Sequence, residues 1–273
     1  MIPDLQVKPG VPLDHLEWCG KYIAEKEPDV VVQIGDFADM ESLSSYDQGK
    51  KSSEGRRVEA DIQATKQALG LLQKGMGGFV PPRMVLTLGN HENRIIRAIE
   101  DDPKWEGRIS IDHLGYKEFG WEVIPFLQPI NIDGVTYCHY FPSGPKGYAI
   151  GSAAKLLSTY HVTCVAGHQQ GRLAAGPILT GDGRFIHAII AGSFYQHKEG
   201  YLPGIQKQHW CGIVVLNEVR DGMFDEMYVS LDFLRRKFNV RKSHSLDHRK
   251  ARVARRHRGR TVGKTRGRRR RSA

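Results

Sequence analysis

Two short apolar runs, each closed by glycine and each followed by a helical segment, constrain the fold of this chain most. The first is DVVVQI at 29–34, before Gly35, and the second is MVLTL at 84–88, before Gly89. Runs of this length without polar alternation are typical of strands covered on both faces. Segments with helical spacing alternate with these runs, at 13–27, 58–74 and 92–100. This alternation indicates a largely parallel α/β core.

The second half of the chain is richer in predicted strands. We expect strands at 121–126, 129–132, 135–140, 162–165, 184–191, 212–217 and 223–231. Asp-Gly pairs at 133–134, 182–183 and 221–222 are typical of the turns between strands, and one helix is predicted over 149–160. The simplest packing of these elements is two β-sheets flanked by helices.

The positive charge of the chain is concentrated at its end. Residues 235–273 hold 18 Lys and Arg residues and one acidic residue, a net charge of +17, whereas residues 1–234 carry −7. This segment has low complexity and little apolar surface, so we expect it to be disordered on its own. The predicted organisation is a folded domain over 1–234 and a basic tail over 235–273.

The arginine-rich tail favours binding to the phosphates of nucleic acid, without sequence preference and with steep salt dependence. Its one aromatic residue outside histidine is Phe238, so stacking on bases is not expected. The alternatives are an acidic protein, a membrane surface, or a tail that only improves solubility. Of these four interpretations we favour nucleic acid.

The sequence also indicates where the protein resides. No apolar run reaches the ~20 residues that a membrane-spanning helix needs, and the start MIPDLQVKPG lacks the basic and apolar stretches of a secretory signal. The cysteines at 19, 138, 164 and 211 are spaced singly, which argues against a disulfide framework or a thiolate zinc site. We therefore expect a cytoplasmic protein with no membrane partner.

Polar side chains of one chemical kind follow several predicted strands. They are Asp4 and Gln6 at the chain start, Asp36 after Gly35, Asn90, His91 and Glu92 after Gly89, His139 after 135–138, and His168 and Gln170 after Gly167. Because ligands bind beyond the carboxyl ends of strands in α/β sheets, we expect these groups to converge at one edge. Carboxylate, amide and imidazole groups together are ligands of divalent metals such as Mn, Fe, Zn or Mg. Two such ions can clamp the oxygens of a displacement at phosphorus.

The order of these motifs resembles that of the calcineurin-like metallophosphoesterases, most of all the bacteriophage-encoded members. The matching blocks are D-x-Q at 4–6, G-D-x-x-D at 35–39, G-N-H-E at 89–92, the strand-end His139, and G-H-Q-Q at 167–170, within roughly residues 1–230. G-D-x-x-D alone is a weak signal, whereas the ordered set is specific. The resemblance implies an α/β fold, a four-layer α-β-β-α sandwich with two mixed β-sheets. It also implies hydrolysis of phosphate mono- or diesters by a metal-activated water, in the host cytoplasm if the protein is phage-encoded.

The resemblance implies a metal-binding role for seven residues. Asp36 resembles the carboxylate that bridges two divalent ions. The other expected ligands are Asn90, His139 and His168 for one ion, and Asp4, Gln6 and Gln170 for the second. We expect Mn²⁺ first, with Mg²⁺, Fe or Zn²⁺ as alternatives.

The resemblance also implies roles beyond metal binding. With Asp36, the expected catalytic residue is His91, which resembles the non-ligand imidazole that contacts the phosphate and stabilises or protonates the leaving oxygen. Asp39 and Glu92 are expected to orient their neighbours. Arg94 lies just beyond His91 in the chain, and a guanidinium there could bind phosphate oxygens in a bidentate way. Solvated charge is the other interpretation of Arg94.

The chain departs from the family pattern in two ways. The family usually has His at the positions of Gln6 and Gln170, and both fall on the same ion. Amide oxygens weaken that site for Zn or Fe, favour Mn or Mg, or leave the site empty until substrate arrives. The second departure is that residues 1–3 alone precede Asp4, where the family has a full buried strand. Either the strand is missing or the true start lies upstream, and we favour the latter.

Less specific interpretations remain beside this one. A single histidine at a strand end is more often structural than a ligand, and Asp36 alone could cap the following loop. Gln6 and Gln170 could be the relic of a lost site. The rival function is then a non-catalytic nucleic-acid-binding protein on a degenerate phosphoesterase scaffold. Retention of His91 argues against it, and metal content distinguishes the two. The remaining histidines are expected to be surface or core residues, with His197 the best candidate for a substrate contact.

Overall fold

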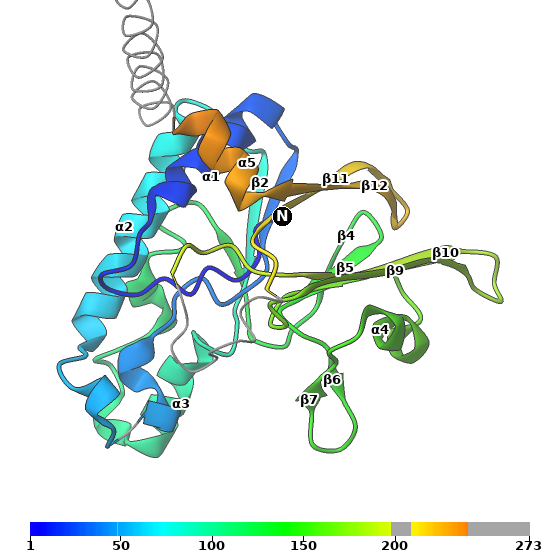
Figure 1. Ribbon diagram of the computed structural model, residues 1–273. Coiled ribbons are helices and arrows are strands. Elements are labelled where there is room, and N and C mark those ends of the chain that lie inside the picture. Colours follow the sequence, from blue (N-terminus) through cyan, green and yellow to red (C-terminus); the bar gives the residue numbers. More distant parts are fainter. Residues whose placement is uncertain (48, 198–208, 240–273) are drawn as a thin grey trace, which may run out of the picture.

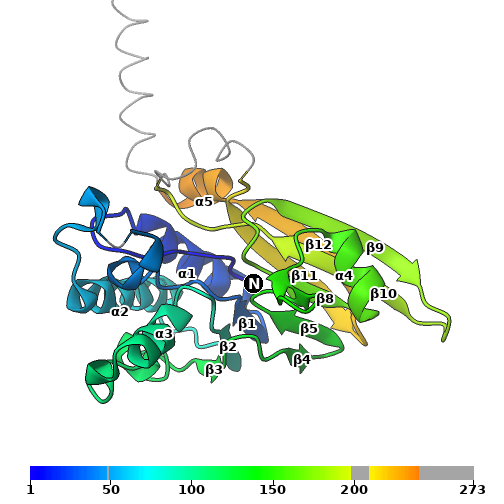
Figure 2. The same cartoon turned by 90° about the horizontal axis from the view of Figure 1, so that it is seen from below.

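The computed structural model describes residues 1–47, 49–197 and 209–239 and has a mixed α/β fold (Figure 1). The expected α/β class is confirmed. Its α-helices within these ranges are α1 (Asp14–Lys26), α2 (Val58–Met76), α3 (Asn93–Asp101), α4 (Ala153–Tyr160) and α5 (Leu231–Phe238). Short 3-10 turns are η1 (Glu41–Leu43), η2 (Ser45–Asp47), η3 (Lys51–Ser53), η4 (Pro103–Trp105) and η5 (Ile111–Leu114). Figure 1 and Figure 2 place α1, α2 and α3 on one side of the molecule and α4 on the other.

The first sheet has three parallel strands. They are β1 (Val30–Gln33), β2 (Arg83–Thr87) and β3 (Glu122–Ile124), in that spatial order. Helix α2 lies between β1 and β2 in the chain and makes the crossover that parallel pairing requires. The strands predicted at 29–34, 84–88 and 121–126 are therefore present; the first and third are shorter than expected, and the second is shifted by one residue.

The second sheet has five strands and is mixed. Its strands are β4 (Ile130–Ile132), β5 (Val135–Cys138), β8 (Cys164–Ala166), β10 (Phe185–Ala191) and β9 (Arg172–Leu179), in spatial order. The inner strands β5, β8 and β10 are parallel, and the edge strands β4 and β9 are antiparallel to their neighbours. Two antiparallel pairs complete the strands: β6 (Pro142–Ser143) with β7 (Tyr148–Ala149), and β11 (Gly212–Arg220) with β12 (Met223–Ser230).

The first seven residues run beside β1 without forming a regular strand. They make isolated parallel bridges between Ile2 and Gln33, Asp4 and Ser193, and Val7 and Ala38. The carbonyl oxygen of Met1 accepts a hydrogen bond from the backbone N–H of Val214 in β11. The segment thus lies between β1 and β11, which places Asp4 and Gln6 beside the end of β1.

Three clusters of buried apolar side chains hold these elements together. One joins the helices α1, α2 and α5 to the first sheet and includes Leu86 of β2. The second joins the two sheets and includes Val85 of β2 and Ile189 of β10. The third joins the second sheet to α4 and includes Ile190 of β10. Because adjacent residues of one strand point to opposite faces, both faces of each sheet are covered.

Several elements differ from the sequence predictions. Strands β6 and β7 were not predicted, and the helix expected over 149–160 begins at Ala153, because Ala149 lies in β7 and Ser152 caps the helix. Strand β9 was not predicted, because its residues are largely exposed and give no alternation; Leu179, for example, is 60% exposed. Helix α5 continues to Phe238 and crosses the boundary predicted between 234 and 235, because Leu231 and Leu234 pack into the core. The rest of the basic tail, 240–273, lies outside the described residues. No helix in the described ranges has the length and apolar character needed to cross a membrane.

Candidate metal centre

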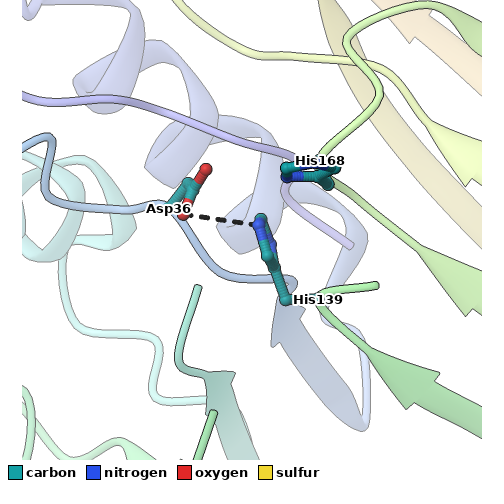
Figure 3. A group of neighbouring side chains, drawn as sticks. All are labelled: Asp36, His139 and His168. Atoms are coloured by element: carbon teal, nitrogen blue, oxygen red, sulfur yellow. Dashed lines mark ion pairs between the residues drawn. The ribbon is translucent and has the colours of Figure 1, made fainter. Parts of the chain in front are cut away.

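Four side chains from the two sheets meet at one point. Asp36 follows β1 and Asn90 follows β2 in the first sheet, whereas His139 follows β5 and His168 follows β8 in the second. One ligand atom each from Asp36, His139 and His168 lies within 4.8 Å of the others (Figure 3). The carboxyl ends of the parallel strands therefore converge as the sequence indicated. The side chains that follow them form a group that could hold a metal ion.

The atoms that face one another in this group are mostly hydrogen-bond acceptors. The Oδ1 atom of Asn90 lies 2.9 Å from Nε2 of His139 and 2.8 Å from Nδ1 of His168. The Nε2 atom of His139 is also 3.4 Å from Oδ1 of Asp36. Nδ1 of His139 lies 2.9 Å from the carbonyl oxygen of Ile34, which can only accept, so Nδ1 carries a hydrogen. In the neutral ring Nε2 is then an acceptor, and a cation would satisfy this set.

Burial and charge shift the pKa values of these groups strongly. Burial opposes ionisation of Asp36, but the neighbouring His139 and His91 outweigh it and hold its pKa well below the usual range. Burial on its own would lower the pKa of His139. The charge of the Asp36 carboxylate and the hydrogen bond to it act in the opposite direction, and the pKa rises to about 9 overall. Burial and the His139 charge lower the pKa of His168 to about 4. A proton on His139 thus supplies the positive charge that the acceptors need, which is the role that a bound cation would take over.

The glycines that precede Asp36 and Asn90 leave room for side chains of the site. A Cβ on Gly35 would lie 2.5 Å from Nδ1 of His139. A Cβ on Gly89 would overlap Oδ1 of Asp36. Side chains at these two positions would therefore displace the metal-binding atoms, which explains why the turns after β1 and β2 contain glycine.

Three candidate ligands have left-handed backbone conformations. The φ angles are 45° for Gln6, 51° for Asp36 and 66° for His168. Such angles cost free energy in residues other than glycine, and they persist where the surrounding structure fixes them, often at functional sites. The backbone N–H groups of Leu5 and Gln6 both donate to the carbonyl oxygen of Asp36, at 2.9 and 2.8 Å, so the two turns support each other.

Asp4, a candidate ligand of the second ion, is not part of this group. Asp4 is fully buried, and both of its carboxylate oxygens lie 3.1 Å from the backbone N–H of His168. Burial raises the pKa of Asp4 to about 7. A Cβ on Gly167 would lie 2.5 Å from Oδ1 of Asp4, so this glycine leaves room for the carboxylate. Gln6 is buried, and its Oε1 atom has no hydrogen-bond partner among the described residues.

Gln170 contacts Tyr195, which in turn contacts His209, and the sequence analysis gave neither residue a role at the site. The hydroxyl of Tyr195 donates a short hydrogen bond to Oε1 of Gln170, and the same hydroxyl lies 3.0 Å from Nδ1 of His209. Tyr195 is 4% exposed, and a buried tyrosine hydroxyl usually has a polar partner. Its place four residues after strand β10 is the signal that could have identified it.

His91 lies beside the metal-binding group and is held by Asp39. Its Nδ1 atom is 2.8 Å from Oδ1 of Asp39, and its Nε2 atom is 3.7 Å from Oδ2 of Asp36. Asp39 also pairs with Lys8 at 2.9 Å and with Nη1 of Arg94 at 2.9 Å. Nη2 of Arg94 lies 3.4 Å from Nε2 of His91. Arg94 is therefore an internal partner of Asp39 through one nitrogen, and its other nitrogen faces the reactive side of His91.

Glu92 ties the turns after β1 and β2 together. Its carboxylate accepts hydrogen bonds from the backbone N–H groups of Asp36 at 3.1 Å, Ala38 at 2.8 Å and Gly89 at 2.9 Å, and from the hydroxyl of Tyr116 at 3.0 Å. The residue is fully buried. Glu92 thus has the orienting position expected of it, because it fixes the backbone on either side of the Asp36 side chain.

The arrangement could hold a metal ion beside the imidazole of His91. Cavities of about 460 Å³, between α4 and the β9–β10 hairpin, and about 570 Å³, along α1, β1 and β11, lie apart from it. The chain matches no model of a known protein family, and a search of curated proteins gives no match. Its function must therefore be argued from the residues of the site.

Proposed function

We propose that the chain is a metal-dependent phosphoric ester hydrolase of the calcineurin-like kind, with a four-layer α-β-β-α core. The ordered motifs support the family, and the three apolar clusters support the four layers. The observation that carries the proposal is the place of His91. Its Nε2 atom faces the metal-binding group while its Nδ1 atom is held by Asp39. A purely structural imidazole has no need of this arrangement.

Asp36, Asn90, His139 and His168 would hold the ion. Two imidazoles, one amide oxygen and one carboxylate fit Mn²⁺, Fe²⁺ or Zn²⁺, and we propose Mn²⁺ first. A divalent ion here supplies Lewis-acid polarisation of a phosphoryl oxygen and a lowered pKa of a bound water. The protein's own contribution is to hold the four ligand atoms in place through Ile34, Glu92 and the glycine turns.

His91 would act on the leaving oxygen of the ester. Burial lowers the pKa of His91, but Asp36 and the hydrogen bond to Asp39 raise it above its ordinary value overall. The protonated form of the ring is therefore favoured, and from this form Nε2 can donate a proton to the oxygen that departs from phosphorus. Nη2 of Arg94, 3.4 Å from that nitrogen, is placed to bind an oxygen of the same phosphate.

The charge of the tail supports nucleic acid as the substrate class. A net charge of +17 over 235–273 would hold a polyanion near the site through its phosphates. We propose that the protein acts in the cytoplasm. The rival proposal, a non-catalytic nucleic-acid-binding protein, is supported by the same charge and differs in requiring no metal.

The test is hydrolysis of bis-p-nitrophenyl phosphate and p-nitrophenyl phosphate with added Mn²⁺. Asp36→Asn and His91→Ala should abolish turnover in folded protein. Asp133→Asn is the matched control for Asp36, because Asp133 also has a left-handed φ of 51° but lies in an exposed turn. A folded protein with no turnover with Mn²⁺, Mg²⁺, Fe²⁺ or Zn²⁺ would reject the enzyme, and failure to bind any of these ions would favour the rival.

A further inference from the structure

We infer that Gln6 and Gln170 form an amide subsite that hydrogen-bonds the substrate's phosphoryl oxygen and the attacking water, in place of a second metal ion. The active protein then holds a single divalent ion, at Asp36, Asn90, His139 and His168. This inference rests on the proposed phosphoesterase function. It rests also on the different surroundings of the two sets of candidate ligands.

Gln170 is held through the atom that a metal ligand would use. Its Oε1 atom, the atom that would bind a cation, already accepts the hydroxyl hydrogen of Tyr195. The Tyr195 oxygen is itself 3.0 Å from Nδ1 of His209, so a hydrogen on Nδ1 would complete a relay from His209 through Tyr195 to Gln170. This relay fixes which end of the amide faces Tyr195. The remaining polar group of Gln170 is its NH₂, a double donor that suits an anionic phosphoryl oxygen.

Asp4 supports the turn that carries His168. Both of its oxygens accept from the backbone N–H of His168 at 3.1 Å, and its own carbonyl accepts from the N–H of Phe194 at 2.7 Å. The carboxylate therefore fixes the turn that carries the ligand His168. Its oxygens are not part of the group in which Asp36, His139 and His168 approach within 4.8 Å. We assign Asp4 as a positioning residue for the single ion.

Gln6 supplies the acceptor of the subsite. It is 2% exposed, and its Oε1 atom has no hydrogen-bond partner in the described part of the chain. Leaving a buried carbonyl oxygen unpaired costs about 1–3 kcal/mol, so this atom needs a donor. The backbone N–H of Gln6 donates to the carbonyl oxygen of Asp36 at 2.8 Å, which places the backbone of Gln6 beside that of Asp36. An attacking water there could donate one hydrogen to Gln6.

The experiment counts Mn²⁺ bound to the full chain by equilibrium dialysis and elemental analysis, with and without inorganic phosphate. Phosphate affinity of the Mn²⁺-loaded protein is measured by calorimetry. The variants are Gln170→Glu, which has the same shape but no donor, Tyr195→Phe, and the control Gln169→Glu in the same motif.

We expect one Mn²⁺ per wild-type chain under both conditions. Phosphate affinity should fall about 10-fold or more in Gln170→Glu. In Tyr195→Phe it should also fall, while the number of bound Mn²⁺ ions stays the same. In Gln169→Glu it should stay at the wild-type value.

The outcomes separate this inference from the proposed function. Two Mn²⁺ per wild-type chain, either without phosphate or only with it, would overturn the amide subsite and leave the phosphoesterase in place. Full phosphate affinity in Gln170→Glu would overturn the subsite as well. Failure of the folded wild-type protein to bind any of Mn²⁺, Mg²⁺, Fe²⁺ and Zn²⁺ would overturn the proposed function itself. The wild-type metal count decides the matter even if a variant fails to fold.

Discussion

The Nδ1 atom of His91 lies 2.8 Å from Oδ1 of Asp39, and both residues are almost completely buried beside the metal-binding group. This contact fixes the plane of the imidazole and directs Nε2 toward Asp36. Asp39 also pairs with Lys8 and Arg94. Because these positive charges oppose the effect of burial, the carboxylate stays ionised. The pair therefore resembles a proton donor with a fixed orienting base.

Asp39→Asn should reduce kcat by about 10-fold or more, and more for esters with poor leaving groups, because general acid catalysis matters most for them. Loss of the carboxylate also lowers the pKa of His91. Activity that needs the imidazolium is lost as pH rises through that pKa, so the alkaline limb of the kcat profile should move to lower pH. Steady-state kinetics across pH test this, with the exposed Asp112→Asn as control. An unshifted alkaline limb would contradict the role of His91 as the acid.

Gly89→Ala should remove Mn²⁺ binding. The added Cβ would overlap both Oδ1 and the backbone nitrogen of Asp36, so the metal-binding carboxylate must move. We expect at least about a 10-fold loss of Mn²⁺ affinity by calorimetry, as for other losses of ligand support. Gly78→Ala is the control, because a Cβ at Gly78 meets nothing within 4 Å. Equal Mn²⁺ affinity in the two variants would show that the ion binds elsewhere.

Glu92→Gln should destabilise the fold more than Tyr116→Phe. The carboxylate accepts three backbone N–H groups and the Tyr116 hydroxyl, and an amide would turn a donor toward donors. Hydrogen bonds to charged groups contribute about 1.5–3 kcal/mol each, so we expect a loss of at least about 3 kcal/mol for Glu92→Gln. Tyr116→Phe removes one of the four bonds and should cost about 1 kcal/mol. Urea denaturation measures both, and comparable losses would argue against the network.

His15 should make the fold acid-sensitive. The residue is buried on α1, its ring 5.0 Å from that of Phe194, and burial lowers its pKa from 6.5 to about 3. The unfolded chain therefore binds a proton first as pH falls, and stability is lost between pH 6.5 and about 3, by up to about 5 kcal/mol. His15→Phe should flatten this slope in urea denaturation. The exposed His161→Asn, at a left-handed position that Asn tolerates, should keep the wild-type slope.

The sequence was most informative where buried strands end in glycine. β1 and β2 were predictable because they are covered on both faces and read as continuous apolar runs. Asp36 and Asn90 follow them directly, so their convergence could be expected from strand direction alone. The roles proposed for these residues stay predictions, and so does the division of the chain at 234.

The parts that could not be predicted depend on contacts between distant segments. Strand β9 is an exposed edge that pairs with β10 and has no hydrophobic alternation of its own. The hydrogen bond from Tyr195 to Gln170 joins residues that follow two different strands, β10 and β8. No local sequence pattern encodes this contact. The D-x-Q motif predicted a role for Gln6 at the site. The burial of its Oε1 atom, unpaired among the residues that the structure describes, depends on neighbours in space and could not be predicted from the chain.

The four residues of the metal-binding group come from two separate sheets, with Asp36 and Asn90 on one and His139 and His168 on the other. An ion bound here would be a cross-link that closes loops of the chain from residue 36 to residue 168. Its binding free energy would be added to the cohesion between the sheets. Chelation would then loosen the interface along which the two halves of the molecule meet, and amide exchange at the ends of β1 and β8 would report it without any substrate.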